Sequence, residues 1–303
     1  MRSAPRALAA ASALLVALGL AACSSPAAPP ASPAAVPTAG APAAAASPTP
    51  TATTAEGAET SSTVVAALGD SLSLGFNACD HYGDCPSTSW ITGTDQTVDS
   101  IASRLRAKTG APVTVHNDAR SGVSVDDLPR QVDLAIAQHP DLVTVLIGGN
   151  DICKATVADM TSARAYSDVV ETQLTRLAAA LPDARILVAS VPDVTDLRPV
   201  AAANPTARFL WTTLGGCTTV LGDPQSDSVA TQNRLATVRD RIDAYNEALA
   251  TTCATLPRCV WDDGALNRYQ PTMAQLSALD YFHPSLAGLR ELAEIEWNAL
   301  QHD

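Results

Sequence analysis

The sequence has little positive charge. Its 303 residues include 19 lysines and arginines against 31 aspartates and glutamates, which gives a formal net charge of −12 at pH 7. Nucleic-acid binding and adsorption to anionic membranes both rely on clustered basic side chains. The composition therefore argues against a nucleic-acid partner and against a polybasic membrane-surface protein. Only two lysines occur, Lys108 and Lys154, so a lysine-based phosphate loop has almost no candidates.

Long apolar segments are also missing. The apolar run at residues 7–20 is shorter than the roughly 20 residues that a membrane-spanning helix needs. Two arginines precede this run and small residues follow it, so residues 1–22 are expected to form a secretory signal peptide. Residues 20–23 read LAAC and resemble a bacterial lipobox, which implies that Cys23 carries a lipid and becomes the mature N-terminus. We expect a lipoprotein on the extracytoplasmic face of the cell membrane; an ordinary signal peptide, giving a secreted protein, is the alternative.

Residues 23–62 lack the side chains that build a core. After the cysteine, this segment contains no aromatic residue, leucine or isoleucine and consists almost entirely of alanine, proline, serine and threonine. Such a segment cannot bury enough apolar surface to offset the entropy of ordering the chain. We therefore expect a disordered tether, about 120 Å long when fully extended, followed by a folded domain at residues 63–303.

The folded domain alternates between two hydrophobic patterns. Short, continuous apolar runs predict buried strands, and segments with apolar residues three or four apart predict helices. This alternation predicts an α/β fold with a central parallel sheet covered by helices on both faces. Binding sites in such sheets form at the carboxyl ends of the strands. The predicted strands are residues 63–68, 113–117, 142–147, 186–191 and 259–261, and the predicted helices are residues 99–108, 128–137, 166–181, 231–253 and 286–300.

Two motifs at predicted strand ends contain groups suited to nucleophilic catalysis. The motif GDSLSLG places Ser71 directly after the first strand. A serine at a strand-to-helix turn has an exposed hydroxyl and a free backbone N–H, and both features suit a nucleophile. The motif GGND follows the third strand, where the amide of Asn150 is able to face a developing oxyanion.

Two further motifs supply the complementary groups. Gly122, a few residues beyond the second strand, allows the backbone to approach a substrate and present an N–H. Near the C-terminus, the motif DYFHP contains Asp280 and His283. At this spacing in a turn, the carboxylate is able to bond the histidine Nδ1–H while Nε2 faces a serine, as in a general-base triad.

Together these motifs resemble those of the GDSL or SGNH hydrolase family, over about residues 63–303. The resemblance implies a flavodoxin-like, three-layer α/β sandwich and a serine ester hydrolase that needs no metal or other cofactor. It implies that Ser71 is the nucleophile, His283 the general base and Asp280 the residue that orients the histidine. It also implies an oxyanion hole formed by the backbone N–H groups of Ser71 and Gly122 and the amide of Asn150.

The seven cysteines become an even set of six once Cys23 is assigned to the lipid. Six cysteines allow fifteen pairings, of which the sequential one is the simplest. It also resembles the pattern of secreted actinomycete GDSL esterases and lipases: Cys79–Cys85, Cys153–Cys217 and Cys253–Cys259. The middle bridge is expected to anchor residues 193–228, the least regular segment, beside the loop of Asn150, so that this segment forms one wall of the substrate cleft.

The sequence thus predicts a lipid-anchored esterase or lipase that cleaves acyl esters outside the cytoplasmic membrane. One alternative keeps the chemistry but takes O-acetyl groups from polysaccharide, and another is a surface-binding lipoprotein with a degenerate hydrolase domain. Nothing in the sequence indicates more than a monomer. Asp70 and Asp151 are expected to shape their loops. His81 is expected in solvent and Trp90, Phe209, Trp211 and Trp261 in the core, and the alternative for each of these five is a place in the wall of the substrate pocket.

Overall fold

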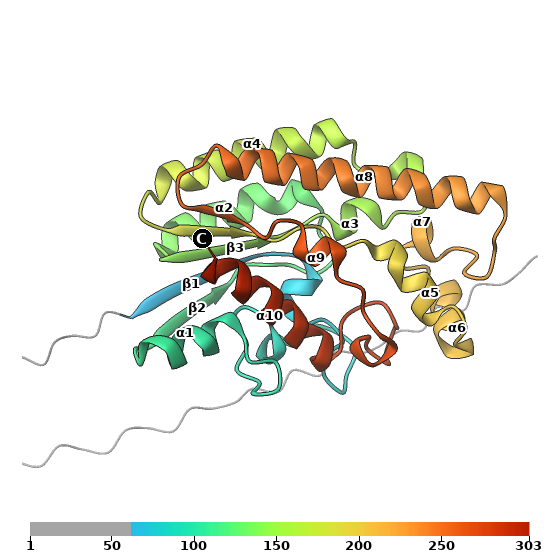
Figure 1. Cartoon of the computed structure of the whole chain (residues 1–303), viewed down its shortest axis with the longest axis horizontal. Coiled ribbons are helices and arrows are strands. Elements are labelled where there is room, and N and C mark those ends of the chain that lie inside the picture. Colours follow the sequence, from blue (N-terminus) through green and yellow to red (C-terminus); the bar gives the residue numbers. More distant parts are fainter. Residues whose placement is uncertain (1–61, 303) are drawn as a thin grey trace, which may run out of the picture. The chain divides into compact units, whose positions relative to one another are not determined.

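Five parallel strands form the sheet at the centre of the protein (Figure 1). The computed structural model describes residues 62–302, so the predicted signal peptide, Cys23 and the tether up to residue 61 lie outside the described residues. The strand order is β2-β1-β3-β4-β5, the flavodoxin-like order. All five predicted strands are present, although the fourth ends before residue 191: β1 (Thr63–Gly69), β2 (Val113–Asn117), β3 (Leu142–Leu146), β4 (Arg185–Val188) and β5 (Cys259–Trp261).

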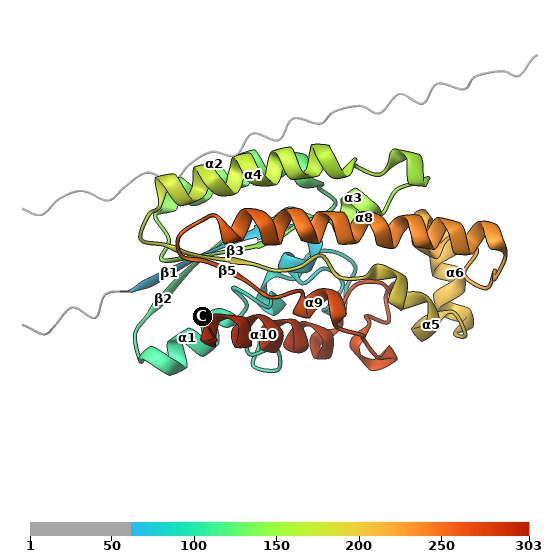
Figure 2. The same ribbon diagram turned by 45° about the horizontal axis from the view of Figure 1, so that its top comes forward.

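Helices cover both faces of the sheet, as predicted (Figure 2). One layer contains α2 and α4 with α8, and the other contains α1 and α10. The five predicted helices are confirmed with small shifts of their ends: α1 (Ile101–Thr109), α2 (Leu128–Gln138), α4 (Ala163–Ala180), α8 (Val229–Ala254) and α10 (Leu286–Gln301). Several begin at a serine whose hydroxyl accepts a hydrogen bond from the first turn, such as Ser162 before α4.

The side chains of the strands alternate between two apolar cores. In β1, Ala66 and Leu68 join the core beneath α2, α4 and α8, whereas Val65 and Ala67 join the core beneath α1 and α10. All four are fully buried. The strands are continuous apolar runs because both of their faces lie against helices.

Residues 193–228 are more helical than the sequence suggested. They contain α5 (Leu197–Ala201), α6 (Pro205–Leu214) and α7 (Thr218–Leu221). Pro205 is compatible with a helix because it is the first residue of α6, where its missing N–H costs no hydrogen bond. Two further short helices, α3 (Gly149–Ile152) and α9 (Ala265–Arg268), complete the fold. None of the helices within residues 62–302 combines the length and the hydropathy of a membrane-spanning segment.

Candidate active site

Ser71 lies at the carboxyl edge of the sheet, in the first position of a 3₁₀ turn (Ser71–Leu74). The turn starts where the side chain of Asp70 accepts a hydrogen bond of 3.0 Å from the Leu72 N–H. It ends at Gly75, which has a left-handed backbone. The bend before it requires Gly69, because its φ is +151° and an added Cβ would lie 2.4 Å from the Leu146 carbonyl oxygen. The strand end thereby presents the Ser71 hydroxyl at the surface of the sheet edge.

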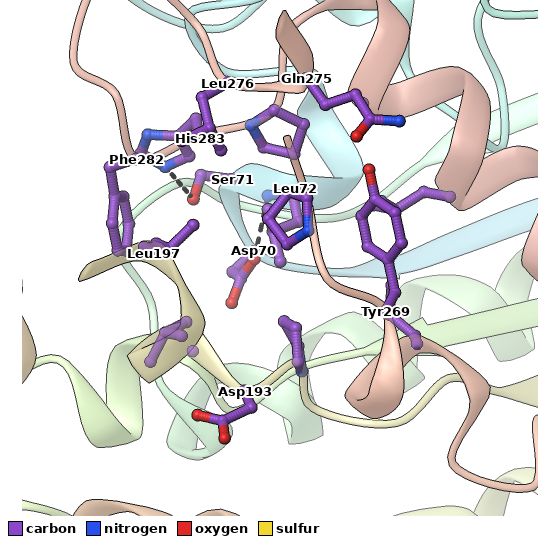
Figure 3. A pocket seen from close by; sticks show the side chains of 18 of the residues that line it. Asp70, Ser71, Leu72, Asp193, Leu197, Tyr269, Gln275, Leu276, Phe282 and His283 are labelled. Atoms are coloured by element: carbon purple, nitrogen blue, oxygen red, sulfur yellow. Dashed lines mark hydrogen bonds between the residues drawn. The ribbon is translucent and has the colours of Figure 1, made fainter. Parts of the chain in front are cut away.

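The side chains of Ser71, His283 and Asp280 form a chain of two hydrogen bonds, and Figure 3 shows the one between Ser71 and His283. The Oγ of Ser71 lies 2.9 Å from Nε2 of His283. The Nδ1 of His283 lies 2.6 Å from Oδ2 of Asp280. The intervening turn passes through Tyr281, whose φ is +53°. The structure thus brings together the three residues that the sequence assigned to the triad, in the order that the chemistry needs.

The Asp280 carboxylate is buried and accepts four hydrogen bonds. Its Oδ1 accepts the backbone N–H groups of Phe282 and His283 at 2.9 and 3.0 Å. Its Oδ2 accepts from the side chains of His283 and Asn77 at 2.6 and 2.7 Å. Burial alone would raise the pKa of Asp280, but the hydrogen bonds and the charge of a protonated His283 outweigh it and hold the pKa below its ordinary value. The carboxylate is therefore ionised at neutral pH.

Gly122 and Asn150 face the same space as the Ser71 hydroxyl. Both residues line one pocket together with Ser71 and His283. Within residues 62–302, no hydrogen bond engages the backbone N–H of Ser71 or of Gly122. The amide nitrogen of Asn150 donates to the Val123 carbonyl at 3.0 Å and to Oδ2 of Asp70 at 3.3 Å. Two unpartnered N–H groups and one amide donor therefore lie around the Ser71 hydroxyl.

Asp70 and Asp151 are buried carboxyls that hold the loops around the site. Besides the Leu72 N–H, Asp70 accepts the long hydrogen bond from Asn150. Asp151 accepts the Val125 N–H at 2.9 Å and so ties α3 to the loop that follows Gly122. Burial raises the pKa of each to about 6. Their contacts match the structural roles that the sequence suggested.

A narrow, mostly apolar pocket opens beside the nucleophile (Figure 3). Its volume is about 80 Å³. Its floor and walls come from elements far apart in the sequence, because the carboxyl ends of β1, β3 and β4 meet the chain around α9 and α10 there. The apolar lining includes Leu72, Val194, Leu197, Leu266, Leu276 and Leu292.

A second, wider pocket lies on the Gly122 side of the same residues. Its volume is about 500 Å³. Ser71, Asn150, Phe282 and His283 line both pockets. The predicted wall segment, residues 193–228, contributes to both: Val194 and Leu197 to the narrow pocket, and Trp211 and Leu214 to the wide one. Ser71 therefore lies where an apolar pocket meets a wider, more polar one.

The predicted disulfides are confirmed: Cys79–Cys85, Cys153–Cys217 and Cys253–Cys259. The middle bridge joins the end of α3, which carries Asn150, to the residue before α7. It thereby fixes the wall segment beside the site, as expected. In the part of the chain that the structure describes, no three His, Cys, Asp or Glu side chains gather as metal ligands would.

The prediction for Phe209 was wrong, because its side chain is 64% exposed. It lies on α6, whose buried side is occupied by Ala207 and Trp211, so the outward face is left to Phe209. Trp90 and Trp211 are buried as predicted, and His81 is exposed.

Sequence reasoning missed two residues that contact Asp280. Asn77 bonds its carboxylate, and the Nε1 of Trp211 donates to its backbone carbonyl at 3.1 Å. Both contacts join segments far apart in the chain. No local motif signals either contact.

The model of the GDSL-like lipase/acylhydrolase family matches residues 67–290. Membrane-associated phospholipase B1 of Rattus norvegicus is 28% identical over 170 residues, which make up 45% of this chain and 12% of that protein. The protein of the same name from Mus musculus is 28% identical over 212 residues, 56% of this chain and 14% of the mouse protein. This chain therefore matches only a small part of either phospholipase.

Two solved structures share the fold. An α/β-hydrolase enzyme from the metagenome of Lake Arreo, Spain, has a TM-score of 0.51 and 18% identity, over 79% of this chain and 95% of that one. A catalytic mutant of an acetylxylan esterase from Geobacillus stearothermophilus has a TM-score of 0.50 and 19% identity, over 80% of this chain and 96% of that one. At these identities the similarity establishes the three-layer α/β architecture.

Proposed function

Because the chain belongs to the GDSL-like lipase/acylhydrolase family, and so is a carboxylic ester hydrolase, we propose that it cleaves acyl esters through a Ser71–His283–Asp280 triad and an acyl-enzyme. The observation that carries this proposal is the unbroken chain of hydrogen bonds from Ser71 Oγ to Nε2 of His283 and from Nδ1 of His283 to the Asp280 carboxylate. The ionised Asp280 keeps the Nδ1 proton in place, so Nε2 is free to accept the serine proton.

The reaction runs in two halves. Ser71 Oγ attacks the ester carbonyl carbon while His283 Nε2 takes its proton. The tetrahedral intermediate collapses, the ester C–O bond breaks, and the alcohol leaves with the proton from His283. Water then attacks the acyl-enzyme with His283 again acting as base. The carboxylic acid and free Ser71 are the products.

The oxyanion of each tetrahedral intermediate is bound by three donors. The N–H groups of Ser71 and Gly122 have no other acceptor within residues 62–302, which suits this role. Asn150 supplies the third donor by redirecting its amide from the 3.3 Å contact with Asp70. The shorter bond to Val123 keeps the side chain in place meanwhile.

The two pockets divide the substrate at the scissile bond. The apolar lining of the narrow pocket suits the acyl group, and the wider pocket beside Gly122 suits the alcohol. A volume of about 80 Å³ favours short acyl chains over long ones. A series of p-nitrophenyl esters from acetate to palmitate tests this division: kcat/KM should be highest for short chains and fall toward palmitate.

The second candidate is removal of O-acetyl groups from polysaccharide. The acetylxylan esterase of similar fold and the small acyl pocket favour it. Activity confined to p-nitrophenyl acetate, with acetate released from acetylated xylan, would select this function. Comparable activity on butyrate and octanoate would select a general esterase.

We also propose that the enzyme acts outside the cytoplasmic membrane, anchored by lipid on Cys23. Three disulfides in the domain suit an oxidising compartment. The test is the fractionation of cells that produce the full chain or Cys23→Ala. The full chain should sediment with membranes and incorporate labelled palmitate. A Cys23→Ala chain with the same sedimentation and the same label would contradict the anchor.

The catalytic assignment is tested with Ser71→Ala. Its kcat should fall by at least about a thousandfold, because the covalent step is lost. Ser73→Ala, in the same 3₁₀ turn but outside the triad, is the matched control and should retain most of the activity. Equal activity of the two variants would contradict the role of Ser71.

A further inference from the structure

Asn77 connects the triad to the loop that follows the nucleophile. It lies six residues after Ser71, is 1% exposed, and has a φ of +60°. Asparagine adopts this left-handed conformation more readily than most residues. The turn directs its side chain toward Asp280, which lies 203 residues further along the chain.

The amide of Asn77 is oriented by partners on both of its ends. Its Oδ1 accepts the Gly83 N–H at 2.9 Å, so the other end must be the nitrogen. That Nδ2 donates to Oδ2 of Asp280 at 2.7 Å. The same Oδ2 accepts the Nδ1–H of His283. Asn77 and His283 therefore share one oxygen of the carboxylate.

Backbone contacts keep Asn77 itself in place. Its N–H donates to the Gly83 carbonyl at 2.8 Å, and its carbonyl accepts the Ser277 hydroxyl at 2.6 Å. Gly83 belongs to the loop closed by Cys79–Cys85. The carboxylate is thus connected to a covalently closed loop through one amide.

We propose that Asn77 is a positioning residue for catalysis: its amide holds the Asp280 carboxylate in the orientation that keeps Nδ1 of His283 protonated and Nε2 facing Ser71. This inference rests on the proposed triad. Without the amide, Oδ2 would bond only the histidine, and the carboxylate would be fixed only through Oδ1. The imidazole would then visit orientations in which Nε2 is out of reach of the serine.

Replacing Asn77 with aspartate tests the Nδ2 donor with the least change in the shape of the side chain. An aspartate at this position keeps an acceptor for the Gly83 N–H and tolerates the left-handed turn. It donates to Asp280 only while protonated, because two ionised carboxylates repel each other at this distance. In this variant, three carboxyl groups lie around His283: the introduced aspartate at position 77, Asp280 and Asp70.

The expected result is a pH-dependent loss of kcat. The ratio of Asn77→Asp kcat to wild-type kcat should be close to one near pH 5 and fall tenfold or more by pH 8, with KM within about twofold. Asn77→Gly keeps the backbone conformation and removes the amide, so its kcat should be lowered at every pH. Asn246→Asp is the matched control: its amide bonds Val191 through both ends, away from the triad, and its kcat ratio should not vary with pH.

Two outcomes would overturn the inference. One is a wild-type kcat for both Asn77 variants. The other is a loss of kcat that follows the loss of folded protein, with no change in the pH profile, since this would assign Asn77 a structural role only. If Asn77→Asp does not fold, Asn77→Gly tests the inference instead, which then predicts a lower kcat without a matching change in KM.

Proton NMR separates this inference from the proposed function. The Nδ1 proton of His283, held in a 2.6 Å hydrogen bond to a carboxylate, should give a far-downfield resonance that is absent in His283→Ala. This resonance should shift or broaden in Asn77→Gly and remain in Asn246→Asp. An unchanged resonance in Asn77→Gly would overturn the positioning role. A wild-type protein that shows the resonance but hydrolyses no ester would contradict the proposed function alone.

Discussion

The indole Nε1 of Trp211 donates a hydrogen bond of 3.1 Å to the backbone carbonyl of Asp280. Trp211 lies on α6, in the segment tied by Cys153–Cys217 to the helix that carries Asn150. One bond thus connects the wall of the wide pocket to the turn that carries Asp280 and His283. The wall and the triad are consequently held as one unit.

This relationship predicts the effect of Trp211→Phe. The variant keeps an aromatic ring in the core but removes the donor, which should cost about 1 kcal/mol of stability and loosen the Asp280 turn. We expect kcat to fall several-fold, measured with p-nitrophenyl butyrate, together with a lower melting temperature.

Trp90→Phe is the matched control for that experiment. Trp90 is fully buried, but within residues 62–302 its Nε1 has no hydrogen-bond partner, so its replacement removes no hydrogen bond. The control should retain its kcat. Similar losses of kcat in the two variants would show that the indole bond to Asp280 has no special role.

Two disulfides of equal loop size allow a second matched comparison. Cys79–Cys85 and Cys253–Cys259 each join residues six apart, and the chain-entropy model assigns each about 2 kcal/mol. Replacing either pair with serine should lower the melting temperature by a similar amount. Only the double variant Cys79→Ser/Cys85→Ser should also lower kcat. The loop that this bridge closes contains Gly83, whose N–H and carbonyl both bond Asn77.

The test is the kcat of each double variant, measured at a temperature at which both remain folded. Cys253–Cys259 lies between α8 and the start of β5, at the sheet edge opposite the site. An equal kcat for the two double variants would contradict a link between the 79–85 loop and the triad.

Glu296 should make the stability depend on pH. It is fully buried on α10, where it lies within hydrogen-bonding reach of the Asp262 carboxylate. Burial first, and the negative charge of Asp262 second, raise the pKa of Glu296 well above its ordinary value. The folded protein therefore binds a proton there that the unfolded chain has released, so the free energy of unfolding falls as pH rises above the ordinary glutamate value of about 4.5.

Glu296→Gln removes this proton uptake. The melting temperature of the variant relative to wild type should be higher at pH 8 than at pH 5. Glu247→Gln, an exposed position on α8, should show no such change between the two pH values. If the melting temperatures of Glu296→Gln and wild type change in parallel from pH 5 to pH 8, the burial of a protonated carboxyl is contradicted.

Much of the fold was predictable because its signals are local. A strand buried on both faces must be apolar throughout, so β1 and β3 stand out in the sequence. The triad was predictable for a related reason: Ser71 and the Asp280–His283 pair occupy short turns whose residues determine their conformation. The topology of a parallel sheet then brings strand ends together whatever the spacing along the chain.

The contacts around the triad were not predictable in this way. Asn77 and Trp211 act on Asp280 across 203 and 69 residues, and their roles depend on how loops pack rather than on neighbouring residues. The exposure of Phe209 has the same origin. Its helix has a buried and an outward face, and only tertiary packing decides which residues occupy each.

The most direct test of the account is covalent labelling of the nucleophile. A fluorophosphonate reacts with a serine activated by a neighbouring base and leaves a stable adduct. Mass spectrometry of the labelled wild-type protein should place a single adduct on the peptide that contains Ser71, with activity lost in proportion to labelling. Ser71→Ala should remain unlabelled and inactive. An adduct on another residue, or full ester hydrolysis by Ser71→Ala, would contradict the assignment of Ser71 as the nucleophile.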